Sequence, residues 1–201
     1  MYNGYILIND TIRIVGNASE GTEFLNHFLV GVPYEYGSHI IRCIAYDTSS
    51  VFNVTLDVPL ENRVGFYAVE IGFPQPLNIS CGTTHAFTVG FILSNDLLSN
   101  LAKNNFTFGF PAYPSLTKTV TRCNVTVVLP EGAGNITIAK DDGAVKASTY
   151  SKENLLAFTC SSANIIFSLS DSQIQLVDVK ELKREVRINE VGEIEGSDSY
   201  Y

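Results

Sequence analysis

The asparagines are the residues whose spacing points most clearly to chemistry. Seven of them begin an Asn-x-Ser/Thr triplet with no proline in the middle, which is the acceptor pattern for N-linked glycans. This composition would give roughly two or three such triplets by chance, so the pattern is enriched. It predicts an extracytoplasmic chain with glycan acceptors at Asn9, Asn17, Asn53, Asn78, Asn105, Asn124 and Asn135. The alternative is that half-exposed strands, which place polar residues on either side of an apolar one, produce the triplets without any glycan.

The four cysteines, Cys43, Cys81, Cys123 and Cys160, are widely separated in the chain. None belongs to a Cys-x-x-Cys pair, which argues against a zinc site or a dithiol redox motif. An even number of cysteines in an extracytoplasmic β-protein is compatible with one or two disulfides, and sequence cannot choose among the three pairings. Buried free thiols on apolar strand faces are the alternative.

The other residues that could act in catalysis are isolated. The histidines His27, His39 and His85 have no carboxylate or cysteine at the spacing of metal ligands. Asp141 and Asp142 are adjacent, so their side chains diverge in an extended chain, and the glycine that follows is typical of a turn. The sequence has no nucleophile motif and no phosphate-binding glycine loop. We therefore expect no catalytic residues, no metal site and no cofactor.

Composition narrows the class of partner. The 201 residues carry a net charge of −8, and the only close group of basic residues, Lys180, Lys183 and Arg184, is interleaved with Glu181 and Glu185. A chain of this kind has no surface to neutralise phosphates, which argues against nucleic acid. No apolar run approaches the roughly 20 residues that cross a bilayer, and the N-terminus does not resemble a signal peptide. We expect any membrane anchor to lie in a segment outside this chain.

The elements that must position these residues are mostly strands. Apolar and polar residues alternate with a period of two through most of the chain, and Thr, Tyr and Phe are frequent. The leucines of Ser94–Asn104 instead favour one short helix, and Leu155–Cys160 and Ile174–Val179 are expected to be strands. The prediction is an all-β, β-sandwich-type domain of about a dozen strands with one short helix.

The end of the chain resembles its beginning. Aligning Gly192 with Gly4 places Ile194 on Ile6 and Asp198 on Asp10, and about 190 residues, one domain length, separate the two copies. We therefore expect residues 1–181 to form the β-sandwich domain and residues 182–201 to be the opening hairpin of a following module, with further sequence beyond both ends. Two small packed β-subdomains, about 1–93 and 105–181, are the alternative for the first part. The closing strand should pair on the edge of the preceding sheet or fray beyond Gly196.

Several stretches resemble ribophorin I, a subunit of the membrane oligosaccharyltransferase. PAYPSLTKTVTRCNVTVVLP (111–130) is similar to a family loop that runs into a long strand, and LKREVRINEVGEIEGSDSYY (182–201) is similar to the hairpin that opens the family's second luminal domain. FLNHFLVGVP (24–33) and GYILINDT (4–11) stand in the expected order before them. The chain departs from the family at Val191, where the family has a turn tryptophan.

The resemblance implies a non-catalytic accessory subunit in protein N-glycosylation. Such a subunit is the extracytoplasmic part of a membrane-anchored protein, and it stabilises a glycosyltransferase complex or guides the acceptor polypeptide. Its partners would be the other subunits of that complex. If a surface binds them, we expect it in the loop that contains Tyr113, Pro114, Thr117 and Lys118, although Tyr113 could instead hold that loop on the sheet. The alternative function is a structural or adhesion β-domain of a cell-envelope glycoprotein.

Overall fold

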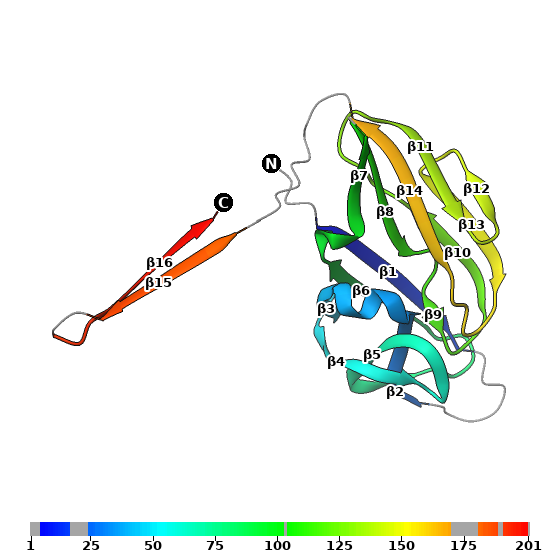
Figure 1. The fold of residues 1–201 in the computed structure, drawn as a ribbon. Coiled ribbons are helices and arrows are strands. Elements are labelled where there is room, and N and C mark those ends of the chain that lie inside the picture. The colour runs from blue at the N-terminus through cyan, green and yellow to red at the C-terminus, as the bar shows by residue number, and fades with distance from the viewer. Residues whose placement is uncertain (1–4, 17–23, 103, 170–180, 189–190, 201) are drawn as a thin grey trace.

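The described part of the chain is built almost entirely from β-strands. The computed structural model describes residues 5–16, 24–102, 104–169, 181–188 and 191–200. These residues form sixteen strands and two 3₁₀ helices, η1 (Tyr34–His39) and η2 (Asn95–Leu97) (Figure 1). The predicted all-β, sandwich-like fold class is therefore confirmed, with more strands than the dozen expected.

The largest sheet has seven strands. Their order is β1 (Ile6–Val15), β6 (Thr84–Leu93), β3 (Ile40–Tyr46), β4 (Val51–Leu60), β5 (Arg63–Asn78), β2 (Phe24–Pro33) and β9 (Ser115–Leu116). The inward faces of these strands form one core, in which Phe52, Phe73 and Phe87 meet edge to face at 5.4–6.1 Å between ring centroids. This geometry brings the positive edge of one ring to the negative face of the next.

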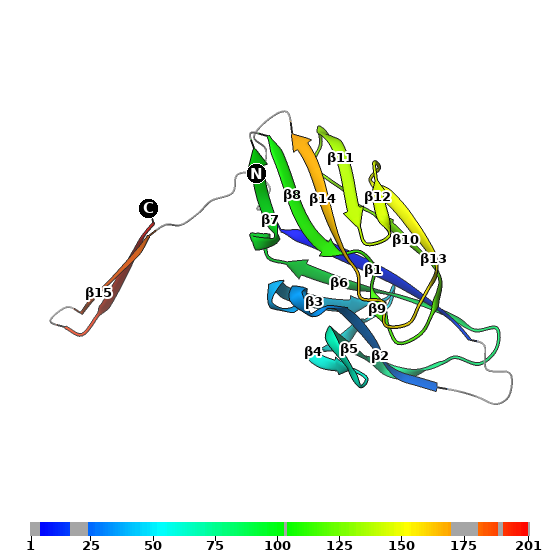
Figure 2. The same cartoon turned by 45° about the vertical axis from the view of Figure 1, so that its right-hand side comes forward.

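A five-stranded sheet forms the other main layer. Its order is β12 (Gly143–Val145), β11 (Ala133–Lys140), β14 (Ser162–Leu169), β8 (Asn105–Pro111) and β7 (Leu98–Ala102). The inward residues of a separate antiparallel pair, β10 (Val120–Thr126) and β13 (Thr149–Leu155), pack against the core of this sheet. Phe167 lies at its centre and contacts the rings of Phe106 and Phe108. Figure 2 shows the five-stranded sheet beside the strands of the larger one.

The two cores meet at β10 and at the short strand β9. Val120 packs against both cores. Strand β9 returns from the second half of the chain to pair with β2, through Ser115 opposite Gly31. A Cβ atom on Gly31 would lie 3.3 Å from the Cβ of Ser115, so a glycine permits this close approach. The chain therefore divides into two cores near residue 98, but strand pairing crosses that division.

The helix predicted over Ser94–Asn104 is wrong. The structure has only the three-residue η2 there, followed by β7, which pairs with β8. The Ser94 hydroxyl donates to Asp96 and does not cap a helix. A helix this short is marginal in water, whereas pairing with β8 satisfies the backbone along its length. The strand expected at Leu155–Cys160 is also wrong, because β13 ends at Leu155; the strand expected at Ile174–Val179 lies outside the described residues.

The C-terminal stretch forms a hairpin, as expected from its sequence. β15 (Leu182–Ile188) pairs with β16 (Ile194–Tyr200) in a two-stranded sheet of their own. Among the described residues neither strand joins the edge of another sheet, and β16 continues past Gly196 to Tyr200. Both outcomes expected for this strand, pairing on the preceding sheet and fraying beyond Gly196, are therefore wrong. Opposite charges directly across the pair, Arg184 and Asp198, help to explain the continuous pairing.

No helix in the described ranges has both the length and the apolar character needed to cross a membrane.

Candidate functional site

A large groove lies between β1 and β10, and we call it the β1–β10 groove. Its volume is about 1500 Å³. One wall is β1 and the other is β10 with the residues that continue it to Glu131. Its floor is apolar and is formed by residues of the core of the five-stranded sheet, which we call the second core. They include Phe108, Phe110, Leu155 and Phe167. The volume exceeds the roughly 300–1,000 Å³ of typical small-molecule pockets, which favours a larger ligand.

Asp10 is the unusual residue of this groove. Along β1 the more buried positions alternate with exposed ones, and Asp10 shares the buried set with four isoleucines: Ile6, Ile8, Ile12 and Ile14. Asp10 lines the groove and makes no hydrogen bond or ion pair with any described residue. Although water reaches it through the groove, burial among apolar side chains raises the pKa of Asp10 to about 7. A carboxyl group in this setting would be stabilised by a cationic partner.

A carboxyl group with a pKa near neutrality could act as a general acid or base if an activated nucleophile stood beside it. The thiols closest to it electrostatically are those of Cys43 and Cys123. Burial, with a smaller contribution from the Asp10 carboxylate, raises the pKa of Cys43 to about 12 and that of Cys123 to about 11. The thiolate is the reactive form, so both cysteines stay protonated and unreactive at neutral pH. The groove therefore combines an apolar floor with one carboxyl group whose pKa lies near neutrality.

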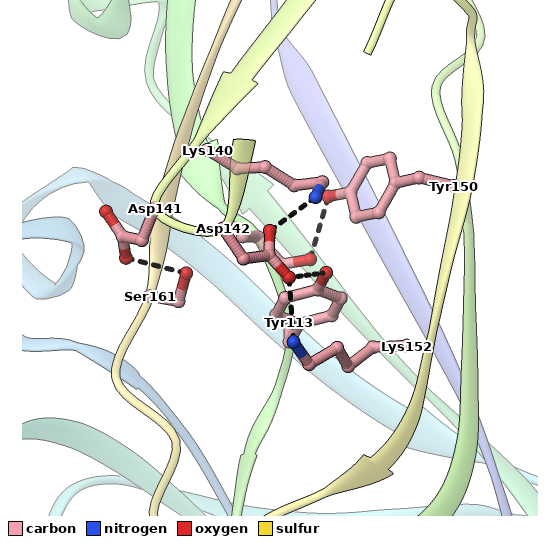
Figure 3. A network of polar contacts seen from close by, with 8 residues as sticks. Tyr113, Lys140, Asp141, Asp142, Tyr150, Lys152 and Ser161 are labelled. Carbon is pink, nitrogen blue, oxygen red and sulfur yellow. Dashed lines mark hydrogen bonds and ion pairs between the residues drawn. The ribbon is translucent and has the colours of Figure 1, made fainter. Parts of the chain in front are cut away.

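A second polar cluster lies around Asp142, in the turn between β11 and β12 (Figure 3). Lys140 and Lys152 donate to its two carboxylate oxygens, the latter at 2.9 Å, and the Tyr113 hydroxyl donates at 3.5 Å. The two lysines lower the pKa of Asp142 to about 2. The neighbouring Asp141 points away and accepts from Ser161 at 2.8 Å. The two aspartates therefore diverge as predicted, and Asp142 is a structural ion-pair partner.

The loop predicted to bind partners is largely buried. Tyr113 is only 3 % exposed, as in the alternative in which it holds the loop on the sheet, and partner binding by the loop stays a prediction. Its ring packs edge to face on Tyr150, whose hydroxyl donates to the backbone carbonyl of Ala112 at 2.8 Å. Tyr113, Pro114 and Lys118 all line the β1–β10 groove. Thr117, which is half-buried, does not.

The cysteines and histidines have structural surroundings. All four cysteines are free thiols, so the disulfides expected as one alternative are not formed in this structure. His85 Nε2 donates to the backbone carbonyl of Asn78 at 2.7 Å, and His39 Nδ1 lies 3.2 Å from Ser94 Oγ. Within the described ranges, no three histidine, cysteine or acidic side chains gather closely enough to hold a metal ion.

The glycan-acceptor asparagines are accessible. Each one that falls within the described residues is exposed: Asn9, Asn53, Asn78, Asn105, Asn124 and Asn135. Asn17 lies outside the described residues. Asn78 is the last residue of β5, and its side-chain oxygen accepts from the backbone N–H of Ser80 at 2.9 Å and from the Ser80 hydroxyl at 2.6 Å. Exposure is a condition for glycosylation, and these positions satisfy it.

Sequence reasoning missed the β1–β10 groove and the position of Asp10 within it. One signal was present: a carboxylate at an inward position of an isoleucine-rich strand breaks the period-two pattern. The other wall could not be inferred, because β10 begins more than a hundred residues later in the chain.

The fold and groove define an all-β protein whose candidate site is a groove between strand edges. No protein-family model matches the chain, and no curated protein matches its sequence.

Proposed function

We propose that this chain is a non-catalytic β-module of an extracytoplasmic protein, and that it acts by binding another polypeptide. The observation that carries the proposal is the β1–β10 groove, which has two strand edges for walls and an apolar floor. Exposed strand edges bind extended polypeptide through main-chain hydrogen bonds, and side-chain pockets beneath them select the sequence. Burial raises the pKa of Cys123, the cysteine that lines the groove, to about 11, so its thiol is not activated at neutral pH.

The extracytoplasmic part of the proposal rests on the acceptor asparagines. The seven triplets are more than composition predicts, and the six described asparagines are exposed. Mass-spectrometric mapping of the protein purified from its native source should find glycans at these positions. Unmodified peptides at all of them would refute this part of the proposal and favour the explanation by strand alternation.

One specific role is an accessory subunit of a membrane oligosaccharyltransferase complex. Its support is the resemblance of residues 111–130 and 182–201 to ribophorin I. In that role the module would stabilise the complex or guide the acceptor polypeptide, with a membrane anchor outside this chain. Affinity purification of the native protein from gently solubilised membranes should recover a multispanning glycosyltransferase. Reproducible absence of that enzyme would refute this role.

A structural or adhesion module of a cell-envelope glycoprotein is the second role. The repeated strand favours it, because β16 resembles β1 and its hairpin with β15 exposes an apolar row, Val186, Ile188 and Ile194. Such a row needs a partner, as repeated modules provide for one another. Recovery of the native protein in cell-envelope fractions as an array of identical subunits, without a glycosyltransferase, would support this role over the first.

A further inference from the structure

Two strand edges border the β1–β10 groove without a strand between them. β1 pairs with β6 along one edge, and β10 pairs with β13. Among the described residues, no strand pairs with the other edge of either one. Between these edges the groove reaches Phe108 and Phe167 on the inner face of the five-stranded sheet. The layer that contains β1 and β10 therefore has room for additional strand over an apolar floor.

Asp10 indicates what an added strand should carry. It is the one acid among the four isoleucines of the inward face of β1, and no described residue donates to it. A buried carboxylate without a partner is costly, and a guanidinium is the group that best neutralises it, because it offers paired N–H donors in a planar fork. A strand with an arginine between apolar residues would therefore complement this face.

The chain contains a second example of the same strand, with its partner present. The alignment of the two ends of the sequence places β16 on β1 and Asp198 on Asp10. Asp198 is held by Arg184 of β15, whose Nε and Nη2 each donate to one carboxylate oxygen at 2.7 Å. The two residues are directly opposite in the antiparallel pairing of β15 with β16. β1 has the acid of this pair but lacks the strand that brings the arginine.

We propose that the β1–β10 groove binds strand β15 of a second copy of this chain, antiparallel to β1, with Arg184 opposite Asp10. The register follows from the β15–β16 pairing, in which Ile188 is opposite Ile194, the counterpart of Ile6. Ile188 is then opposite Ile6 and Val186 opposite Ile8. Val186 and Ile188 are 59 % and 71 % exposed in the free hairpin, so the pairing buries apolar surface on both sides.

The hairpin need not open for this binding. Among the described residues β15 is paired on one edge only, with β16, so its other edge is available to β1. Arg184 would then lie between Asp198 and Asp10, with donors enough for both carboxylates. Because the groove and the hairpin are different surfaces, each copy can bind one neighbour and be bound by another. The contact is head-to-tail and gives rings or open chains of subunits.

This inference deepens the proposed function by naming the bound polypeptide, and it rests on that function. The test is a labelled synthetic peptide of residues 181–200 added to the full chain, with binding followed by fluorescence anisotropy. A matched peptide carries Arg184→Asp and Asp198→Arg, which keeps the charge pair of the hairpin and reverses the charge offered to Asp10. We expect the native peptide to bind and the reversed peptide to bind at least about tenfold more weakly. With an Asp10→Arg chain the preference of the two peptides should reverse.

Equal binding of the two peptides, or no binding of the native peptide, would overturn the inference. Circular dichroism of the Asp10→Arg chain checks that it folds, and an Asp10→Asn chain, which keeps the size of the side chain, provides a second measurement with weaker binding expected. A chain that binds neither peptide but carries glycans and recovers a different protein partner would refute this occupant and leave the proposed function standing. Absence of glycans with normal peptide binding would refute the extracytoplasmic part of the proposed function and leave this occupant standing.

Discussion

Replacing Asp10 by asparagine should stabilise the protein above neutral pH and change its stability little near pH 4. The folded protein holds the Asp10 proton up to a pH of about 7, whereas the unfolded chain releases it near the ordinary value of 3.8. Between these values the folded state binds more protons than the unfolded state, so raising the pH favours unfolding. This destabilisation grows from about pH 4 to about pH 7 and is constant above that. Asparagine does not ionise, so the variant is free of this pH-dependent destabilisation.

The size of the effect follows from the two pKa values. A rise from 3.8 to about 7 corresponds to about 4 kcal/mol, at about 1.4 kcal/mol for each tenfold change in the acid constant. Asp10 is only half-buried, so solvent screens its charge, and we expect about half of this, or about 2 kcal/mol. Cys43 and Cys123 do not add to the effect, because burial keeps their pKa values at about 12 and about 11. The substitution also leaves the Asn-x-Thr triplet at Asn9 intact.

Urea denaturation of the two proteins at pH 4.5 and pH 8 measures the difference directly. The free energies of unfolding should be close at the lower pH, and the variant should be more stable at the higher one. Glu153→Gln, on an exposed position of β13, removes one negative charge away from the groove and is the control. An Asp10→Asn difference that is the same at both pH values would show that the carboxyl group is not shifted, and would refute the reasoning.

Three other substitutions test the structure. Phe167→Ala should lower the free energy of unfolding by about 3–5 kcal/mol, because the residue is 1 % exposed at the centre of the second core. Leu101→Ala, the control at a side chain 57 % exposed, should lower it far less in the same urea titration. Tyr150→Phe should lower the free energy of unfolding by about 1–3 kcal/mol, since it leaves the buried backbone carbonyl of Ala112 without its donor. Tyr46→Phe, the control, should be close to neutral. Equal losses in the two variants would contradict the assigned hydrogen bond. Asp142→Asn should lower the free energy of unfolding by about 1 kcal/mol at pH 7. The two lysines lower the pKa of this carboxyl group to about 2, so the loss should shrink as the pH falls from about 4 to about 2. A loss that persists at pH 2 would refute the ion pairs.

Much of the fold is visible in local sequence. The alternating isoleucines of β1 and the apolar run of β14 have a period of two, and a strand placed at a sheet surface buries every second residue wherever its partner lies. The C-terminal hairpin was predictable for a related reason: its two strands and the turn that joins them are contiguous in the chain. Ser94–Asn104 was not, since its leucines suit a helix and only the presence of β8 makes it a strand.

The candidate site belongs to the tertiary structure. The sequence by itself determines that Asp10 interrupts an isoleucine face and that Asp198 has the same place in the repeated strand. It does not determine that β10, from the other half of the chain, forms the opposite wall of a groove, or that Tyr113 is covered by Tyr150. Alternation specifies which face of a strand is buried, whereas the neighbour on each edge is decided by packing between segments far apart in the chain. An unpaired edge is therefore a property that only the folded chain has.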